Sequence, residues 1–259
     1  MGLPRARHRN SVRPVPDAPG RVAPRPDAPV SAPPALPDVE SAVLPIDKPQ
    51  GLTSFDVIRR LRRILNTKKI GHAGTLDPMA TGLLVCLVGR ATKLSDHFLV
   101  QPKAYAGTIR LGEVTPSQDA DSEVAERRPL DGITEEAIRA AAATLTGSIE
   151  QIPPMYSAVK IGGERLYKKA RRGEEIERAP RPVVVYRFDV EAVRLPDVDV
   201  FVACSKGTYV RTLAYDLGAR LGVGGHLVRL RRTAIGDLNV ENAWTLDALA
   251  AAFAPVPDA

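Results

Sequence analysis

The chain has 259 residues, 44% of them hydrophobic, which is enough for one large domain or two small ones with a substantial core. The apolar run Leu83 to Val88 is far shorter than the ~20 residues that cross a bilayer, and no N-terminal segment has the pattern of a secretory signal. We therefore expect a cytoplasmic protein without a membrane span. A formal net charge of +6 fits a polyanionic partner, although ordinary enzymes also carry such a surplus.

The N-terminal segment has the composition of a disordered tail. Residues 1–40 contain ten of the 23 prolines and show neither helical nor strand periodicity, so we expect residues 1–42 to be disordered. A transit peptide would be amphipathic, rich in serine and poor in acids. This segment instead carries Asp17, Asp27 and Asp38, which does not favour targeting.

The folded part is expected to begin near residue 43 with a short strand and a turn of proline and glycine, in "LPIDKPQGLTS". A helix follows, which Thr53 or Ser54 can cap. Its apolar residues recur at steps of three and four and predict one buried face, with the arginines on the other: Phe55, Ile58, Leu61 and Leu65.

Strands and helices then follow one another without a regular βαβ period. In "AYAGTIRLG" the alternation predicts a strand with Tyr105, Ile109 and Leu111 on one face. The other predicted elements are a capped helix at 134–147, strands at 182–195 and 197–205, a turn and helix at 207–222 and a basic strand at 226–236. This order predicts an α+β fold with a mixed, mainly antiparallel β-sheet.

Cysteine and histidine are too scattered to indicate a metal centre or a redox motif. Cys86 and Cys204 lie singly in apolar runs, and we expect reduced core residues. The four histidines lack close carboxylate or cysteine companions, so we expect no metal.

Basic residues gather in short clusters. A single cluster is usually a solvated face, but several in one chain favour a nucleic-acid partner. The clusters are Arg59-Arg60, Arg62-Arg63, Lys68-Lys69, Lys168-Lys169, Arg171-Arg172 and Arg231-Arg232.

One carboxylate, Asp77, stands among small residues just before a buried strand-like run. Pro78 biases Asp77 toward an extended backbone, which places the carboxylate on a loop at the edge of a strand. Most Asp-Pro pairs only cap turns. The nearby Gly71, Gly74 and Gly82 would also let a ligand approach closely, so composition alone leaves both interpretations open and favours the turn.

Six segments, in this order, resemble the motifs of the TruB family of tRNA pseudouridine synthases. They are IDKPQG at 46–51, GHAGTLDPMATG at 71–82, KAY at 103–105, QIPPMYSAVK at 151–160, SKGTYVRT at 205–212 and LRR at 230–232. The resemblance spans residues 43–250, and the ordered set is specific where any one segment would be weak.

The resemblance implies a pseudouridine synthase catalytic fold, with helices flanking the sheet and a central RNA-binding cleft. It implies that uridine is isomerised to pseudouridine in the T-loop of tRNA (position 55), without a cofactor. Asp77 matches the catalytic aspartate, which attacks a flipped-out nucleotide at the ribose or at the base. A carboxylate suits this task because it is ionised at neutral pH and can later leave.

Other matched residues acquire roles only through the resemblance. Arg211, otherwise a surface residue of a helix, would pair with Asp77 and favour its charged form. Tyr105, otherwise a core residue, would stack on the target base. Tyr209, which could equally be core, would be a second substrate contact, and Leu230 would line the base pocket.

Two further residues are assigned in the same way. His72 would contact the RNA where the target base leaves its stack, although a lone histidine in a glycine-rich loop is more often structural. Lys48 would support the site, although a lysine before proline is commonly just exposed.

The resemblance also implies how RNA is bound. Residues 153–182 occupy the place of an RNA-gripping insertion, whose basic side chains would contact phosphates of the tRNA T-arm and elbow. We expect 251–259 to be a short tail without the extra RNA-binding module that bacterial members usually carry. In the loop "TPSQDADSE", Ser122 replaces a glycine that is common in the family, and the resemblance assigns no role to Asp119. We expect a monomer that needs no protein partner.

Two alternatives remain. One is a guide-RNA-dependent pseudouridine synthase of the dyskerin type, which works in a complex with other proteins. The other is an RNA-binding protein that kept the groove and lost the chemistry, against which the presence of Asp77, Tyr105 and Arg211 argues.

Overall fold

A mixed, mainly antiparallel sheet is the centre of the computed structural model, which describes residues 36–157, 159–170 and 172–254. The strands of this sheet are β1 (Ser41–Lys48), β2 (Ile70–Ala73), β3 (Thr81–Gly89), β4 (Lys103–Leu111), β7 (Gly147–Gln151), β10 (Arg181–Arg194), β11 (Asp197–Cys204), β12 (Gly225–Ile235) and β13 (Leu238–Asn239). Their order is β1-β3-β12-β4-β11-β10-β7, with β2 beside β3 and β13 beside β12.

Helices and two small hairpins complete the described part of the fold. The helices are α1 (Ser54–Ile64), α2 (Ser95–Val100), α3 (Glu135–Ala143), α4 (Leu166–Ala170), α5 (Val210–Arg220) and α6 (Leu246–Ala252), with 3-10 turns η1 (Arg90–Leu94) and η2 (Val240–Asn242). The hairpins pair β5 (Glu113–Val114) with β6 (Glu126–Arg127) and β8 (Lys160–Ile161) with β9 (Glu164–Arg165). The α+β fold class is thereby confirmed. Within the described ranges, none of these helices is long and apolar enough to cross a membrane.

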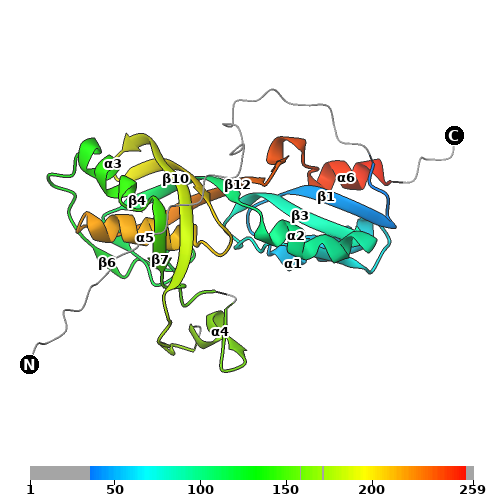
Figure 1. Cartoon of the computed structure of the whole chain (residues 1–259), viewed down its shortest axis with the longest axis horizontal. Coiled ribbons are helices and arrows are strands. Elements are labelled where there is room, and N and C mark those ends of the chain that lie inside the picture. Colours follow the sequence, from blue (N-terminus) through cyan, green and yellow to red (C-terminus); the bar gives the residue numbers. More distant parts are fainter. Residues whose placement is uncertain (1–35, 158, 171, 255–259) are drawn as a thin grey trace, which may run out of the picture.

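The molecule is elongated and consists of two lobes that share this sheet (Figure 1). The β1 lobe contains β1, β2, β3, α1, α2 and α6, and the β10 lobe contains β4, β7, β10, β11, α3 and α5. Strand β12 joins them, because it pairs along β4 but meets β3 only where Arg231 faces Thr81 and Arg232 faces Gly82. This short parallel contact is the waist of the sheet.

Gly82 is required at the waist for a steric reason. Its φ of +96° lies in the region that favours glycine, and a Cβ atom there would stand 2.3 Å from the carbonyl oxygen of Arg232. The loop that carries Asp77 ends at this contact. The glycine therefore sets how closely that loop approaches β12.

Helix α1 begins as predicted, and three of the four apolar residues predicted for its core face are buried, among them Leu65 at 4% exposed. Thr53 is the N-cap, and it forms a capping box with Asp56. Val57, Ile58 and Leu61 are buried, whereas Phe55 is 58% exposed, so the prediction of a buried Phe55 was wrong. The buried arc is centred on Ser54, and Phe55 lies about 100° further round the helix axis.

Other boundaries differ by a few residues. Thr134 caps α3 as predicted, but the helix stops at Ala143 because the chain turns at residues 144–146 and enters β7 at Gly147. The first strand starts two residues before the expected boundary at 43, and α6 runs two residues past 250. Most of the predicted N-terminal tail, residues 1–35, and residues 255–259 of the predicted C-terminal tail lie outside the described residues.

The core follows the predicted alternation. Tyr105, Ile109 and Leu111 of β4 share the face that packs into the main core, as predicted. Cys86 and Cys204 are free thiols and are almost completely buried, which confirms the prediction of reduced core residues.

Candidate active site

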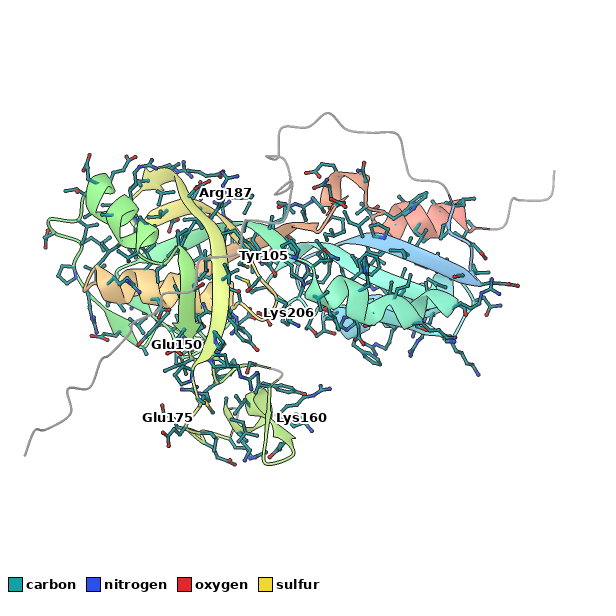
Figure 2. The ribbon with its side chains drawn as sticks, viewed as in Figure 1. Tyr105, Glu150, Lys160, Glu175, Arg187 and Lys206 are labelled. Atoms are coloured by element: carbon teal, nitrogen blue, oxygen red, sulfur yellow. The ribbon has the colours of Figure 1, made fainter. Side chains whose placement is uncertain are left out.

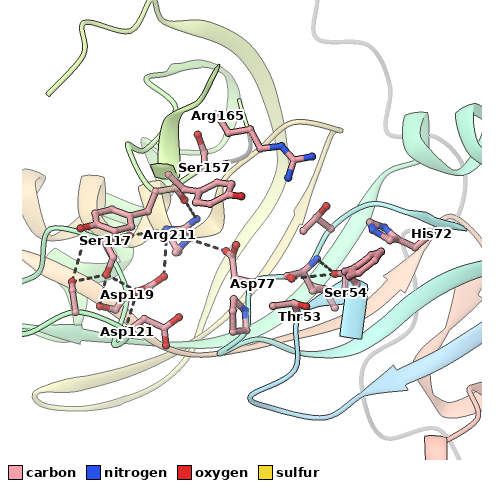
Figure 3. A pocket seen from close by; sticks show the side chains of 17 residues that line it. Thr53, Ser54, His72, Asp77, Ser117, Asp119, Asp121, Ser157, Arg165 and Arg211 are labelled. Carbon is pink, nitrogen blue, oxygen red and sulfur yellow. Dashed lines mark hydrogen bonds and ion pairs between the residues drawn. The ribbon is translucent and has the colours of Figure 1, made fainter. Parts of the chain in front are cut away.

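A pocket of about 790 Å³ opens between the two lobes (Figure 3). The start of α1 and the loop between β2 and β3 form its wall on the β1 lobe, and the loop after β5, the segment around α4 and the start of α5 form the opposite wall. The lining residues are Thr53, Ser54, Phe55, His72, Thr75, Leu76, Asp77, Pro78, Ser117, Asp119, Asp121, Ser122, Tyr156, Ser157, Arg165, Tyr167 and Arg211. Carboxylates, hydroxyls and aromatic rings together suit a polar substrate with a flat ring.

Asp77 presents its carboxylate to this pocket from the loop between β2 and β3. Its side chain is 39% exposed, and the loop is held on both sides of it. The amide of Ala80 donates to the carbonyl of Asp77 (3.1 Å), and the amide of Gly51 donates to the carbonyl of Pro78 (2.9 Å). A backbone fixed in this way limits where the carboxylate can move.

A buried serine connects the same loop to α1. The hydroxyl of Ser54, which is 2% exposed, accepts from the amide of Leu76 (2.9 Å) and donates to the Leu76 carbonyl (3.2 Å). Both backbone groups of the residue before Asp77 are thereby satisfied by one side chain.

Arg211 approaches Asp77 from the other lobe, in the first turn of α5. Its Nε lies 3.0 Å from Oδ2 of Asp77, although the guanidinium is itself only 4% exposed. The remaining nitrogens donate to the carbonyls of Ser117 (2.8 Å) and Tyr156 (2.7 Å). A guanidinium held at three nitrogens has a fixed orientation, and so fixes the carboxylate that it pairs with.

Asp119 is the principal site residue that sequence reasoning missed. Its Oδ2 lies 3.3 Å from Nη1 of Arg211, and both side chains are 4% exposed. The hydroxyl of Ser117 and the amide of Asp121 donate to its other oxygen, at 2.5 and 3.0 Å. The signal available in the sequence was only a pair of aspartates in a loop, which does not reveal the buried arginine that they face.

Burial at the pocket makes Asp77 easier to protonate than an ordinary aspartate. Desolvation raises the pKa of Asp77, Arg211 opposes this effect, and the Asp119 carboxylate adds to it. Desolvation likewise raises the pKa of Asp121, with contributions from Asp119 and Asp77. Three carboxylates, of Asp77, Asp119 and Asp121, therefore repel one another beside the same two cations, Arg211 and Lys48.

Lys48 is the second buried cation near Asp77. It is fully buried at the end of β1, and its ammonium donates to the carbonyls of Leu52 (2.7 Å), Pro49 (3.1 Å) and Pro78 (3.3 Å). Burial lowers the pKa of Lys48 to about 8, whereas the negative charge of Asp77 raises it. Lys48 thus binds the backbone of the Asp77 loop from inside the protein, and it does not line the pocket.

Arg232 holds the same loop from the β12 side. This side chain is 1% exposed, and its guanidinium donates to the carbonyls of Leu83 (2.7 Å), Gly74 (2.9 Å) and Thr75 (3.5 Å). Tyr105 lies beside it, where the two lobes meet (Figure 2). Tyr105 is 9% exposed, and burial raises the pKa of its phenol.

Of the other predicted site residues, only His72 lines the Asp77 pocket, whereas Tyr209 and Leu230 lie outside its lining. His72 lines the pocket, its buried Nδ1 has no hydrogen-bond partner among the described residues, and desolvation lowers its pKa, with Arg232 adding to this effect. Tyr209 is the N-cap of α5, directly before the helix that carries Arg211, and both its backbone groups bind the Gln151 amide (2.9 and 3.1 Å). Leu230 is almost buried and lines a separate depression of about 380 Å³.

The predicted RNA-gripping insertion forms a small unit that projects from the sheet, where Figure 2 labels Lys160 and Glu175. Arg165 and Tyr167 from this unit line the pocket. Arg172 pairs with Glu164 (2.8 Å) and with a second glutamate of the same unit, so part of its charge is balanced internally. In the described part of the chain, no group of three or more His, Cys, Asp and Glu residues is arranged to hold a metal ion.

Comparison with known proteins gives matches along most of the chain. The family model for the N-terminal domain of TruB family pseudouridylate synthase matches residues 62–210, and the model for the tRNA pseudouridylate synthase B C-terminal domain matches residues 211–257. A tRNA pseudouridine synthase B from Thermobifida fusca is 52% identical over 83% of this chain and 76% of its own length. One from Opitutus terrae is 54% identical over 83% of this chain and 89% of its own length.

Chains from two solved complexes are also similar. A chain from a Cbf5-Nop10-Gar1 complex superposes with a TM-score of 0.65 and 31% identity, over 82% of this chain and 54% of that chain. A chain from the archaeal box H/ACA sRNP Nop10-Cbf5 complex gives 0.63 and 29%, over 83% and 54%. This chain therefore spans about half of those matched chains.

Proposed function

Because this chain belongs to the TruB family of pseudouridylate synthases, we infer that it is an isomerase that converts uridine to pseudouridine in tRNA. We further propose that the target lies in the T-loop and that Asp77 is the nucleophile. The observation that carries the proposal is a carboxylate that faces a pocket of suitable size while a buried guanidinium holds it 3.0 Å away.

The reaction breaks the bond between N1 of uracil and C1′ of the ribose and forms one between C5 and C1′. In the proposed mechanism the ionised carboxylate of Asp77 bonds covalently to the extruded nucleotide, at the ribose or at the base. It leaves again once the base has turned. C5 loses its proton and N1 gains one, so no oxidant or reductant is needed. Asp77 serves both halves of the reaction because a carboxylate is a nucleophile and also a leaving group.

Arg211 is proposed to keep Asp77 aimed at the nucleotide. Its guanidinium is already bound to two backbone carbonyls, so it does not have to reorganise when the substrate arrives. Lys48 is proposed to hold the same loop in place, because its buried ammonium donates to the carbonyl of Pro78.

His72 and Tyr105 are proposed to receive the RNA. The imidazole of His72 lines the pocket and is kept neutral by burial, which suits a plane that replaces lost base stacking. Tyr105 lies where the two lobes meet and would contact the target base, and Tyr209 would contact the substrate from the cap of α5. Leu230 is proposed as a further contact of the base, but neither Leu230 nor Tyr105 lines the Asp77 pocket, so these two assignments depend on the family resemblance.

The decisive experiment compares wild-type protein with Asp77→Asn on an unmodified tRNA transcript, without metal or cofactor. The wild type should yield pseudouridine at one T-loop position, mapped by mass spectrometry. The variant should bind the transcript with an unchanged Kd and lose at least about 1,000-fold in kcat, because it lacks the nucleophile. Asp131→Asn, at an exposed position of another loop, is the matched control and should keep full activity. Normal product formation by Asp77→Asn would refute the mechanism.

The same assay separates the alternatives. We propose that the chain acts in the cytoplasm as a monomer, without a guide RNA or protein partner, which its higher identity to the tRNA enzymes than to the chain from the Cbf5-Nop10-Gar1 complex supports. A guide-dependent enzyme would leave the transcript unmodified until guide RNA and partners were added. A protein with binding alone would give a measurable Kd and no product.

A further inference from the structure

We propose that Phe55 is a stacking residue of the RNA interface, whose ring receives an unpaired nucleobase next to the extruded uridine. This inference rests on the proposed function and adds to it a residue that reads the shape of the substrate beside the reacting nucleotide. Of the four apolar residues predicted for the buried face of α1, Phe55 is the one that is exposed.

Phe55 is the most exposed phenylalanine or other large aromatic residue of the described chain, at 58%, yet it does not stand on a remote surface. It lines the same pocket as Asp77 and His72. The buried face of α1 is complete without it, since Val57, Ile58 and Leu61 fill the core. The exposed ring therefore adds accessible apolar surface to the wall of the substrate pocket, where it can contact a ligand.

The ring is held in position before any ligand binds. Its neighbour Ser54 makes two buried hydrogen bonds to the loop of Asp77, so the first turn of α1 is fixed relative to the nucleophile. The guanidinium of Arg62 lies 5.9 Å from the ring centroid, and its Nη2 reaches the carbonyl of Ile70 (3.4 Å). One flank of the ring is therefore supported by a cation, and most of the ring surface stays accessible.

The neighbouring side chains indicate a nucleic-acid base as the partner. His72 supplies a second flat ring on the same pocket wall, where Figure 3 shows it on the side of Ser54. Along α1, Arg59 and Arg63 follow Phe55 at steps of four residues and are exposed, so a basic stripe continues from the ring on one helix face, although Asp56 pairs with Arg59. An aromatic plane followed by a basic stripe is the pattern that binds an unpaired base and its phosphates.

The test uses the Asp77→Asn background, so that tRNA binds without being converted. Phe55→Ala and Phe55→Leu should each weaken binding of an unmodified tRNA transcript about 10-fold, because base stacking on an aromatic ring is lost in both. Phe55→Trp and Phe55→Tyr should bind like the parent. The slope of log Kd against log salt should not change in any of these variants, since no phosphate contact is removed.

A T-arm stem-loop with 2-aminopurine next to the target uridine gives a direct readout of stacking. Its fluorescence should be quenched on binding to the parent Asp77→Asn protein and to the Phe55→Trp variant. It should stay high on binding to the Phe55→Leu variant. Leu99→Ala truncates another exposed apolar side chain of the β1 lobe, 39% exposed on α2, and is the matched control for general loss of apolar surface. It should bind like the parent, and melting temperatures should be equal throughout.

The outcomes distinguish this inference from the function on which it rests. If the wild-type enzyme neither binds nor modifies the transcript, the proposed function fails. If the wild type modifies tRNA while Phe55→Leu binds and quenches like the parent, only the stacking role is refuted. A lower melting temperature of Phe55→Leu that accounts for its weaker binding would also refute the role, because Phe55 would then be structural.

Discussion

Arg211 satisfies two carboxylates at once, one that faces the substrate pocket and one buried behind it. Asp77 therefore shares the guanidinium with Asp119, whose Oδ2 lies 3.3 Å from Nη1 of Arg211. Desolvation raises the pKa of Asp77 and the Asp119 carboxylate adds to this effect, while Arg211 opposes it and orients the Asp77 carboxylate. Such a group keeps its nucleophilic character better than one fully neutralised by a dedicated partner.

This arrangement predicts a bell-shaped dependence of kcat/KM on pH. Asp77 must be ionised, and because its pKa is raised, activity should fall on the acidic side with a midpoint above 3.8, about tenfold per pH unit below it. Lys48 has a pKa of about 8, so its positive charge is present below that pH and is lost as pH rises through it. Activity should therefore also decline above about pH 8.

Two variants test which group causes the decline of activity above about pH 8, the basic limb of the profile. Lys48→Met should remove the limb and lower activity over the whole range, because the loop of Asp77 loses a tether. Lys103, whose pKa burial also lowers to about 8, instead binds the carbonyls at the end of α2. Lys103→Met should keep the limb, and a limb that persists in Lys48→Met would assign it to another group.

At the scale of elements, α1 and the loop after β2 behave as one unit because Ser54 joins them. Ser54→Ala leaves the amide and the carbonyl of Leu76 buried without this partner, which should cost about 1–3 kcal/mol of unfolding free energy. The displaced loop should lower kcat about 10- to 100-fold with a nearly unchanged Kd for tRNA.

A second helix offers the matched control for this prediction. Thr134→Ala removes the N-cap of α3, far from the pocket, and should cost about 1 kcal/mol without changing kcat. Urea unfolding and single-turnover kinetics on both variants measure the two effects separately. An unchanged kcat in Ser54→Ala would show that the loop keeps its position without the serine.

At the scale of the whole molecule, the active site depends on how the two lobes are joined. Asp77 belongs to the β1 lobe and Arg211 to the β10 lobe, while the sheet between them narrows to the short contact of β3 with β12. A distortion of this waist would separate the carboxylate from the guanidinium. The distance between Asp77 and Arg211 therefore depends on the integrity of the contact between β3 and β12.

Gly82→Ala tests that coupling. The added Cβ would meet the backbone of Arg232 at 2.3 Å in a conformation that disfavours a side chain, so we expect a loss of about 3–5 kcal/mol in unfolding free energy together with most of the activity. Gly132 also has a positive φ, but a Cβ atom added there would have no neighbour within 4 Å. Gly132→Ala should cost only about 1–2 kcal/mol, and equal losses in the two variants would contradict the role of the waist.

Local patterns were enough to predict much of this protein. The alternation in β4, the capping threonines of α1 and α3 and the buried run of β3 depend on neighbouring residues, and each was predicted from the sequence. The motif around Asp77 and the arginine of "GTYVRT" pointed to a family and to a candidate pair. The periodicity of helices and strands depends on residues that are close in the sequence, so these elements can be predicted without knowledge of the fold.

What needed the tertiary structure were contacts between segments far apart in the chain. Asp119 meets Arg211, Ser54 meets Leu76 and Leu230 lies outside the pocket only because the sheet brings particular strands together. Phe55 was misplaced because the spacing identified the core-facing side of α1 but not how far round the helix burial extends, and Phe55 lies beyond its edge. The sequence determined the elements and the chemistry that they carry, whereas pairing across the sheet decided which side chains share one pocket, because that pairing depends on the packing of the whole core.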